Sequence, residues 1–282
     1  MQEQINLREK RSLGEIISAT FNYLRFHFKP LYKILLATAG PVFLIAALFI
    51  GGFYGNVFGS FETQQAPDGL AIMSKFFVGM LVFAIGAVVL NGTVTEYMKA
   101  SLTTPKNEIT FKQILDGLKA RFWNYFGASL LVIILIFLGS MALFIPGIWL
   151  YVVFSLIFFT IGIEQKSIGD GFTRSFSLMR GYWWHSFGLY ILTGIIQSAL
   201  TYALAIPLYV VNFLIMFSSG DINNMTENVG TVTSITSTFI MFISALTYSL
   251  STIAAGVNYF SIVESKEEVG LKEKIEAVDT EN

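Results

Sequence analysis

The sequence lacks cysteine altogether and contains only two histidines. The absence of cysteine excludes disulfides, thiolate metal ligands and cysteine nucleophiles, although it leaves the redox compartment undetermined. The two histidines, His27 and His185, would need further ligands to form a metal centre. Both lie in aromatic clusters at the edges of apolar segments, where amphipathic side chains commonly reach toward a membrane interface. We therefore predict no metal site and no cofactor.

Recognisable signatures of catalysis are missing as well. The sequence contains no phosphate-binding loop, no dinucleotide-binding glycine motif, no paired catalytic acids and no Ser/His/Asp constellation. Its paired and single glycines lie within apolar stretches, where glycine typically serves contact between helices. We therefore predict that the protein is not an enzyme, and we expect no nucleic-acid partner.

Charge is the third scarce property. Charged residues form 13% of the chain and hydrophobic residues 54%, whereas a soluble domain has about 25% charged residues. Charge is absent between Lys33 and Glu62, Lys75 and Glu96, Arg121 and Glu164, Arg180 and Asp221, and Glu227 and Glu264. Each stretch can cross a bilayer, because a helix needs roughly 20 apolar residues to span about 30 Å of hydrocarbon. The sequence therefore predicts an all-α integral membrane protein.

The lengths of these stretches predict six transmembrane helices. The third stretch holds two of them, with Pro146-Gly147 as the turn between them. The fourth contains Pro207 near its end, so residues 208–217 either continue the helix past a kink or lie at the interface. The predicted spans cover about 33–54, 72–94, 126–144, 147–164, 185–206 and 235–262.

The placement of lysine and arginine predicts the orientation, because short cytoplasmic loops collect these residues. The N-terminal segment, the segments after spans two and four, and the tail are basic, whereas Lys75 is alone on the other side. A seventh span near Pro207 would place the basic tail outside the cytoplasm. It would also place residues 218–232, a loop without lysine or arginine, in the cytoplasm. We therefore predict that both termini are cytoplasmic, with residues 1–264 as one membrane domain and residues 265–282 as a short tail.

Three cytoplasmic segments begin with a similar capping signal. Ser12-Leu13-Gly14-Glu15, Thr110-Phe111-Lys112-Gln113 and Ser167-Ile168-Gly169-Asp170 each place a hydroxyl three residues before a carboxylate or amide, the pattern of a capping box. Apolar residues follow at helical spacing, and each segment ends in arginine and aromatic residues suited to a membrane interface. We predict interfacial amphipathic helices at about 12–28, 110–124 and 167–183. The fold is then three repeats of an interfacial helix and a transmembrane hairpin.

One region resembles a known family. Residues 144–187 contain Phe144-Ile145-Pro146-Gly147-Ile148-Trp149-Leu150, then Glu164, Ser167, Gly171-Phe172, Ser175, Leu178, Arg180-Gly181 and Trp183-Trp184. This run resembles the six-helix membrane domain of some bacterial glycerophosphoryl diester phosphodiesterases, and it is similar to several uncharacterised bacterial membrane families. Alanine is more usual in that family where Gly171 stands. The resemblance implies a fold and an address in the bacterial plasma membrane. It does not imply the activity, which in those enzymes belongs to a separate soluble barrel.

Three carboxylates are the candidate site residues, because Glu96, Glu164 and Glu264 lie where the predicted hairpins re-enter the cytoplasm. If they converge, they would form a cation or proton site, since intramembrane acids are usually functional. At helix ends, however, water is available and nearby arginines can pair with them, which favours a structural role. The candidate arginines of this cytoplasmic-face cluster are Arg121, Arg174 and Arg180.

The last span is unusually polar for a helix that faces lipid. Its serines, threonines and small residues favour close packing against other helices. A polar pathway along this helix is the alternative, and Asn91 and Asn258 would be its contacts.

The sequence leaves two functional hypotheses. The first is a non-enzymatic scaffold or accessory protein whose cytoplasmic face meets membrane lipids or a cytoplasmic or membrane protein partner. The second is a small lipid or solute transporter or channel that uses the interface between repeats and the polar last helix.

The predicted orientation can be tested with a reporter enzyme fused after Asn282. We expect activity from a reporter that works only in the cytoplasm, because the basic tail disfavours export. Activity confined to a periplasmic reporter would contradict the topology.

Overall fold

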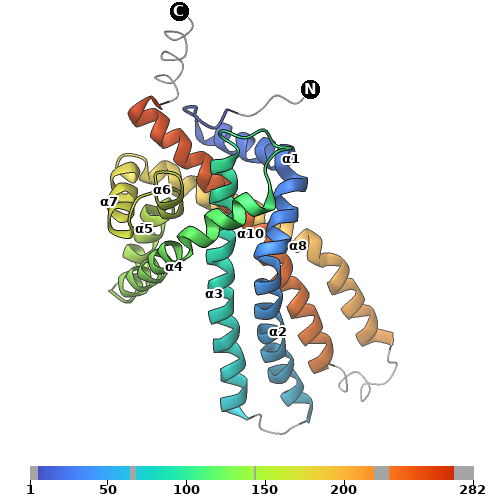
Figure 1. Ribbon diagram of the computed structural model, residues 1–282. Helices are drawn as coiled ribbons and strands as arrows, with labels where there is room; N and C mark the ends of the chain where they lie inside the picture. The colour runs from blue at the N-terminus through green and yellow to red at the C-terminus, as the bar shows by residue number, and fades with distance from the viewer. Residues whose placement is uncertain (1–5, 64–67, 143, 219–228, 270–282) are drawn as a thin grey trace, which may run out of the picture. The chain divides into compact units, whose positions relative to one another are not determined.

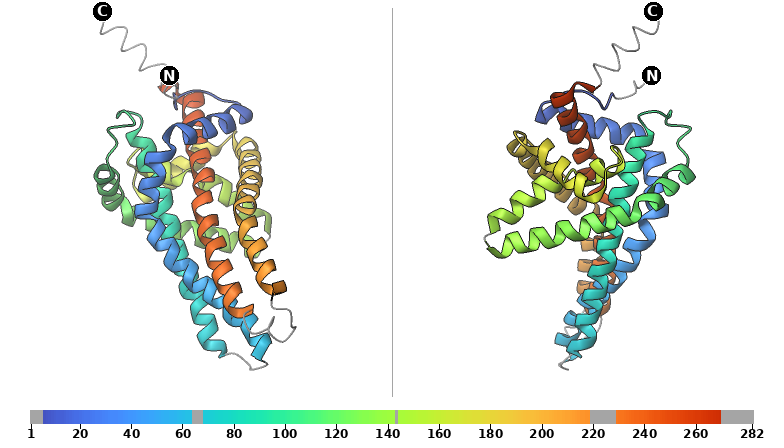
Figure 2. Two further views of the ribbon diagram at one scale, coloured as in Figure 1. Left: turned by 90° about the vertical axis from the view of Figure 1, so that its right-hand side faces the viewer. Right: turned by 60° about the vertical axis from the view of Figure 1, so that its left-hand side comes forward.

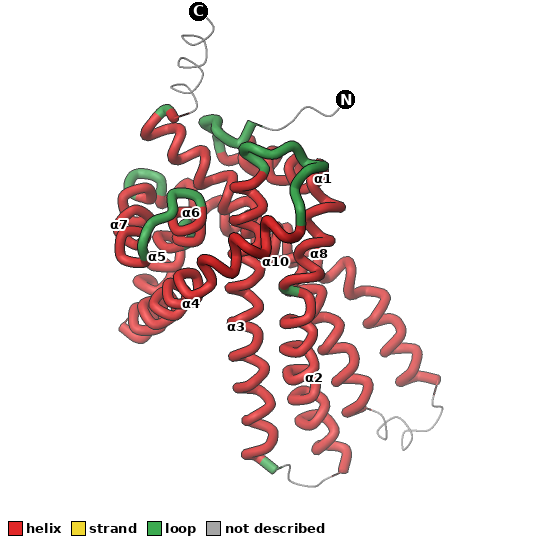
Figure 3. The backbone as a smooth tube through the Cα atoms, in the orientation of Figure 1, coloured by secondary structure: helices red, strands yellow, loops and turns green. Residues whose placement is uncertain are grey.

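The regular structure of the described residues is helical throughout (Figure 3). The computed structural model describes residues 6–63, 68–142, 144–218 and 229–269. The helices are α1 Leu13–Thr38, α2 Gly40–Thr63, α3 Gly69–Ala100, α4 Phe111–Ala142, α5 Phe144–Phe154, α6 Ile157–Gly162, α7 Ile168–Met179, α8 Trp183–Ser218 and α10 Val229–Glu267 (Figure 1).

Six segments of the described residues are long and apolar enough to cross a membrane, which confirms the predicted membrane class. They are Gly40–Ser60, Gly69–Ala100, Phe111–Met141, Phe144–Gly162, Trp183–Leu214 and Gly230–Glu267. The first predicted span, about 33–54, is interrupted at Ala39, where α1 ends and α2 begins. The fourth is one apolar segment made of α5 and α6. Residues 270–282 of the predicted tail lie outside the described residues.

The three predicted helix starts are confirmed by their capping bonds. At α1, the Ser12 amide and hydroxyl donate to Glu15 Oε2 at 2.7 and 2.8 Å. At α4, the Gln113 amide donates to Thr110 Oγ1 at 3.2 Å. At α7, the Asp170 amide donates to Ser167 Oγ at 3.2 Å. Each bond satisfies a donor that the first helical turn would otherwise leave unpaired.

The repeat of an interfacial helix and a hairpin is not confirmed. Only α7 is a separate helix of the predicted kind. The segment 110–124 is the beginning of α4, which continues without a break to Ala142, and the segment 12–28 belongs to α1, which continues to Thr38. A capping box marks where a helix starts, but it carries no information about where that helix ends.

Pro146, predicted to lie in a turn, and Pro207, where two alternatives were left open, both lie inside helices. Pro146 and Gly147 belong to α5, so the prediction of a turn at these two residues is wrong. Pro146 is in the first turn of α5, where its missing N–H costs no helical hydrogen bond. Pro207 lies within α8, and residues 208–217 continue that helix.

The chain divides into two compact units. Unit 1 comprises Met1–Ile34, Asn91–Ile195 and Leu250–Asn282, and unit 2 comprises Leu35–Leu90 and Ile196–Ser249. Within unit 1, α4 packs against α5, and α7 packs against both α5 and α6. Large side chains that are fully buried in this unit include Tyr23, Tyr97, Tyr125 and Tyr259.

Unit 2 is a bundle of helical segments from α2, α3, α8 and α10, which run alongside one another in Figure 2. The segments approach closely at glycines. A Cβ at Gly51 of α2 would lie 2.0 Å from Thr238 Oγ1 and 2.7 Å from the Ser234 carbonyl oxygen of α10. Thr238 Oγ1 also donates to the Ala47 carbonyl oxygen at 3.3 Å. Small residues at such contacts let helix backbones approach without a hydrophobic driving force.

Substitution of Gly51 should separate α2 from α10. We expect Gly51→Ala to lower the free energy of unfolding by about 1–3 kcal/mol, because the added methyl overlaps the α10 backbone. Gly52→Ala is the matched control, since a Cβ at Gly52 meets no atom within 4 Å, and it should gain up to about 1 kcal/mol from helix propensity. Thermal unfolding in detergent, followed by circular dichroism, measures both. Equal stability of the two variants would contradict this packing.

Candidate functional site

The Glu96 carboxylate is held by two residues of α4 within unit 1. Arg121 Nη1 donates to its two oxygens at 3.0 and 3.1 Å, and the Tyr125 hydroxyl donates to Oε1 at 2.8 Å. Arg121 and Tyr125 are four residues apart, so they project from one face of α4. Gly117, one turn earlier, leaves the space that the carboxylate occupies, because a Cβ there would lie 2.5 Å from Glu96 Oε2. Glu96 is only 6% exposed, which makes this pairing necessary for its burial.

Lys99 extends this cluster to α6. Its Nζ donates to the Gly162 carbonyl oxygen at 2.9 Å, and Gly162 is the last residue of α6. A lysine that satisfies a carbonyl at a helix C-terminus also interacts favourably with the helix dipole. The end of α3 is thereby tied to both α4 and α6.

A second carboxylate cluster joins the segment after α6 to α7 and α10. Arg174 Nε donates to both oxygens of Glu164 at 2.9 Å, and the Tyr259 hydroxyl donates to Glu164 Oε1 at 2.8 Å. Arg174 Nη1 donates to Glu267 Oε1 at 2.5 Å. The hydrogen bond to Glu267 is the largest influence on Arg174 and raises its pKa above the usual value. Lys166 Nζ lies 3.7 Å from Glu164 Oε2.

The two clusters share one arrangement. In each, a carboxylate at the end of an apolar segment accepts from one arginine and one tyrosine hydroxyl. Charge-assisted bonds of this kind are stronger than neutral hydrogen bonds. These bonds fix Glu96 and Glu164 between neighbouring helices, which favours a structural role for both carboxylates.

Two of the candidate carboxylates are paired with candidate arginines, Glu96 with Arg121 and Glu164 with Arg174. Arg174 also binds Glu267, which was not among the predicted site residues. Glu267 lies three residues after Glu264 on α10, so the two carboxylates share a helix face. Arg180 lies after α7 with its guanidinium over the Phe176 ring, 5.7 Å from the ring centre.

The two asparagines proposed for a polar pathway bond to different helices. Asn91 Oδ1 accepts from Thr252 Oγ1 at 2.9 Å, which joins α3 to α10. Asn258 Nδ2 donates to Ser186 Oγ at 2.9 Å, which joins α10 to α8. The other amide atom of Asn258, Oδ1, is buried and has no hydrogen-bond partner among the described residues. The α10 segment is also the most buried of the six apolar segments, at 56%, in accord with the prediction that it faces other helices.

The prediction that both histidines lie at the membrane interface is wrong for His27. His27 is 4% exposed, and its Nδ1 lies 3.0 Å from the Tyr97 hydroxyl. The rings of Tyr23, Phe26 and Tyr97 surround it. Burial, assisted by the positive charge of Lys106, lowers the pKa of His27 to about 4, so this histidine is neutral at pH 7. His185 is half-buried.

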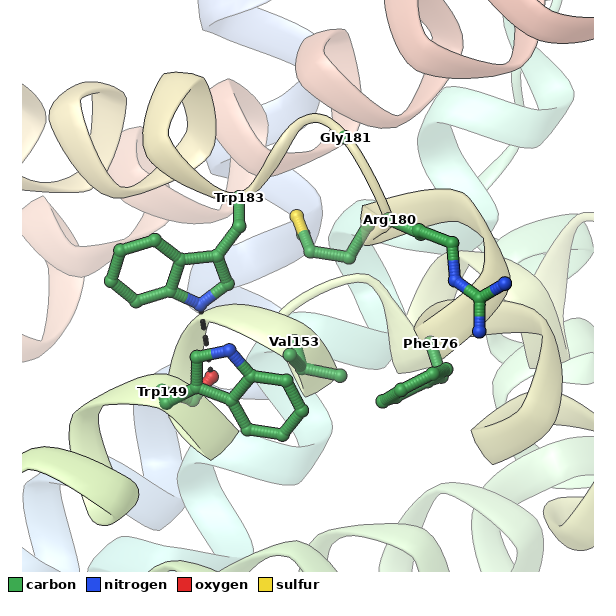
Figure 4. A pocket seen from close by; sticks show the side chains of 7 residues that line it. Trp149, Val153, Phe176, Arg180, Gly181 and Trp183 are labelled. Carbon is green, nitrogen blue, oxygen red and sulfur yellow. Dashed lines mark hydrogen bonds between the residues drawn. The ribbon is translucent and has the colours of Figure 1, made fainter.

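A pocket lies between α5, α7 and the turn that leads into α8 (Figure 4). Its volume is about 210 Å³, and its lining residues are Trp149, Val153, Phe176, Met179, Arg180, Gly181 and Trp183. The Trp183 indole N–H donates to the Trp149 carbonyl oxygen at 3.3 Å. Gly181 has a φ of 87°, a left-handed conformation that favours glycine. Figure 4 shows Arg180 and Phe176 at one end of the pocket and the two indoles at the other.

No group of three His, Asp or Glu side chains in the described part of the chain is placed to hold a metal ion. Glu164 and Glu267 come together only through Arg174, and a guanidinium cannot ligate a cation. Unit 1 thus offers paired carboxylates and an aromatic pocket with a cationic edge.

Comparison with known proteins gives one match. The model of a family described as a domain of unknown function, DUF7847, matches residues 68–264. No curated protein and no solved structure matches the chain. The matched range contains Glu96, Glu164, Arg174 and every residue that lines the pocket, and it begins after α1 and α2.

The Glu96 cluster should contribute strongly to stability. We expect Glu96→Gln to lower the free energy of unfolding by about 2–4 kcal/mol, because Arg121 then remains partly buried without a counter-charge. Adding Arg121→Met should recover part of this loss, since an apolar replacement of both partners is often tolerated. Glu108→Gln is the control on an exposed residue and should change stability by less than about 0.5 kcal/mol. Unfolding in detergent measures all three, and a harmless Glu96→Gln would contradict the structural role.

Proposed function

The chain belongs to the DUF7847 family of unknown function, and we propose that it is a non-enzymatic, multi-pass membrane protein that interacts with membrane lipids through an aromatic and basic surface. The supporting observation is a contrast within unit 1. Arg121 and Arg174 are bound to carboxylates, whereas Arg180 lies among aromatic side chains at an open pocket.

Aromatic exposure in unit 1 supports a lipid-facing role. Trp123 and Trp184 are 75% and 77% exposed, and Trp149 and Phe176 are also exposed. Tryptophan is enriched where a membrane meets water, because its ring is amphipathic. Basic residues beside such rings are attracted to anionic headgroups.

The paired carboxylates argue against catalysis or proton transfer at Glu96 and Glu164. A general acid or base must be free to meet its substrate, but the oxygens of each carboxylate already accept hydrogen bonds from an arginine and a tyrosine of neighbouring segments. These residues are therefore consistent with a non-enzymatic scaffold. Such a scaffold could also bind a cytoplasmic or membrane protein partner.

The cellular location and the orientation of the chain are part of the proposal. We place the chain in a bacterial plasma membrane with both termini in the cytoplasm, on the distribution of lysine and arginine. The resemblance to the membrane domain of glycerophosphoryl diester phosphodiesterases supports that location. The resemblance itself remains a prediction.

One observation favours the alternative of transport. Asn258 Oδ1 is an unpartnered buried acceptor on α10, near the hydroxyl of Ser186. A buried polar atom without a partner is a natural place for a water molecule or an ion. A polar pathway along α10 would include this atom and Asn91, which already bonds to Thr252.

Reconstituted protein distinguishes the two functions. We expect proteoliposomes to be no more permeable to protons or K⁺, and to move fluorescent phospholipid between leaflets no faster, than protein-free vesicles. A pH-sensitive dye, a K⁺-sensitive dye and dithionite quenching measure these three fluxes. Flux that depends on the protein and is abolished by Glu164→Gln or Asn258→Leu would overturn the scaffold proposal, and Glu108→Gln serves as the control.

A further inference from the structure

We propose that the pocket lined by Trp149, Phe176, Arg180 and Trp183 binds one anionic phospholipid, with its phosphate at Arg180 and its adjoining apolar chain against the indoles. The inference rests on the proposed lipid interaction and specifies its site and lipid class. Three features of unit 1 support it: an unpaired cation, an apolar wall and a positive helix end.

The cation is the guanidinium of Arg180. It lies over the Phe176 ring, 5.7 Å from the ring centre, and it forms no ion pair with a carboxylate of the described residues. Arg121 and Arg174, by contrast, have their donors directed at glutamates. Because guanidinium donors form charge-assisted, often bidentate bonds to phosphate, Arg180 is suited to an anionic headgroup.

A second cation reinforces the charge beside Arg180. Lys266 Nζ donates to the carbonyl oxygens of Ser177 and Arg180 at 2.6 and 2.9 Å. These bonds hold a positive charge against the turn that carries Arg180, and Glu267 offsets part of that charge. A phosphate at Arg180 would be attracted by both cations, whereas a cationic ligand would be repelled.

The wall of the pocket is apolar and preorganised. Trp149, Val153 and Met179 line it together with Trp183, and the bond from the Trp183 indole to the Trp149 carbonyl fixes the angle of one ring. An apolar wall with charge at one end matches an amphiphile rather than a free anion (Figure 4). The volume of about 210 Å³ is below the roughly 300–1,000 Å³ of sites that enclose a whole ligand. The pocket therefore holds the part of the lipid next to the phosphate.

The backbone adds positive potential along the turn from Arg180 to Trp183. The left-handed Gly181 turns the chain so that α8 begins at Trp183, which itself lines the pocket. The first amides of a helix have no partner within that helix, and the dipole of the helix favours an anion at this end. Arg180 and the start of α8 therefore favour the same charge.

Quenching of tryptophan fluorescence by brominated lipids tests the site. The chain has four tryptophans, and replacing the two most exposed, as Trp123→Phe and Trp184→Phe, leaves Trp149 and Trp183 at the pocket. In nanodiscs of phosphatidylcholine, we expect brominated phosphatidylglycerol to quench these two indoles at about one tenth of the concentration that brominated phosphatidylcholine requires. A tenfold difference corresponds to about 1.4 kcal/mol, which a single charge-assisted hydrogen bond can supply.

Arg180→Gln should abolish the preference for phosphatidylglycerol without unfolding the protein, because its guanidinium is exposed. Arg25→Gln is the control, since Arg25 is also an exposed arginine and lies within α1, and it should keep the preference. Equal quenching by the two lipids, or an unchanged preference in Arg180→Gln, would overturn the pocket proposal.

Two further outcomes separate this inference from the function on which it rests. If soluble glycerol 3-phosphate competes as well as phosphatidylglycerol does, the site takes a free anion and the lipid assignment is wrong. If phosphatidylglycerol binds the purified protein in native mass spectrometry but does not quench Trp149 and Trp183, the lipid interaction stands and the pocket is wrong. If no lipid remains bound in either measurement, both proposals fail.

Discussion

Burial of the Glu96 carboxylate is the constraint on which unit 1 depends. A charge that is 6% exposed must be paired and hydrogen-bonded, because an unpaired charge of this kind costs several kcal/mol. Arg121 and Tyr125 meet this requirement only if α4 lies against the end of α3 with Gly117 facing the carboxylate. Lys99, three residues after Glu96, then reaches the last carbonyl of α6. Glu96 thus joins α3 to α4, and Lys99 joins the same end of α3 to α6. The Glu164 cluster joins the segment after α6 to α7 and α10 in a similar way.

The pairing of Glu96 and Glu164 with arginines directs the search for a functional group to other polar residues. Carboxylates that are bound to an arginine and a tyrosine stabilise the fold. Other polar groups of unit 1 have unused hydrogen-bonding capacity among the described residues, including Arg180 at the edge of an aromatic pocket and the buried Oδ1 of Asn258. They favour different functions, since Arg180 is suited to bind an anionic headgroup, whereas Asn258 is suited to bind a water molecule or an ion along α10. The geometry around Arg180 is the more complete, because the cation, the apolar wall and the start of α8 all match one amphiphile.

The candidate site could be predicted from the sequence only in part. The acids and arginines at the ends of apolar segments indicated that ion pairs form there, and Glu96–Arg121 and Glu164–Arg174 do so. The second partner of Arg174, Glu267, was not predictable, because Glu264 and Glu267 lie on the same face of α10 and only the packing of that helix brings Glu267 to Arg174. His27 shows the same limit. Its aromatic neighbours in sequence indicated an interface, whereas Tyr97, seventy positions along, encloses it within the protein.

What the sequence by itself determined is the membrane class, the presence of six apolar helices and the three capped helix starts, since each depends on local composition or on side chains a few residues apart. Tertiary structure alone decided where helices end and which side chains meet. The continuous α4, the proline within α5 and the pocket beneath Trp183 all depend on contacts between segments far apart in the chain. Hydropathy is a sum over neighbours in sequence, whereas pairing a buried charge requires neighbours in space.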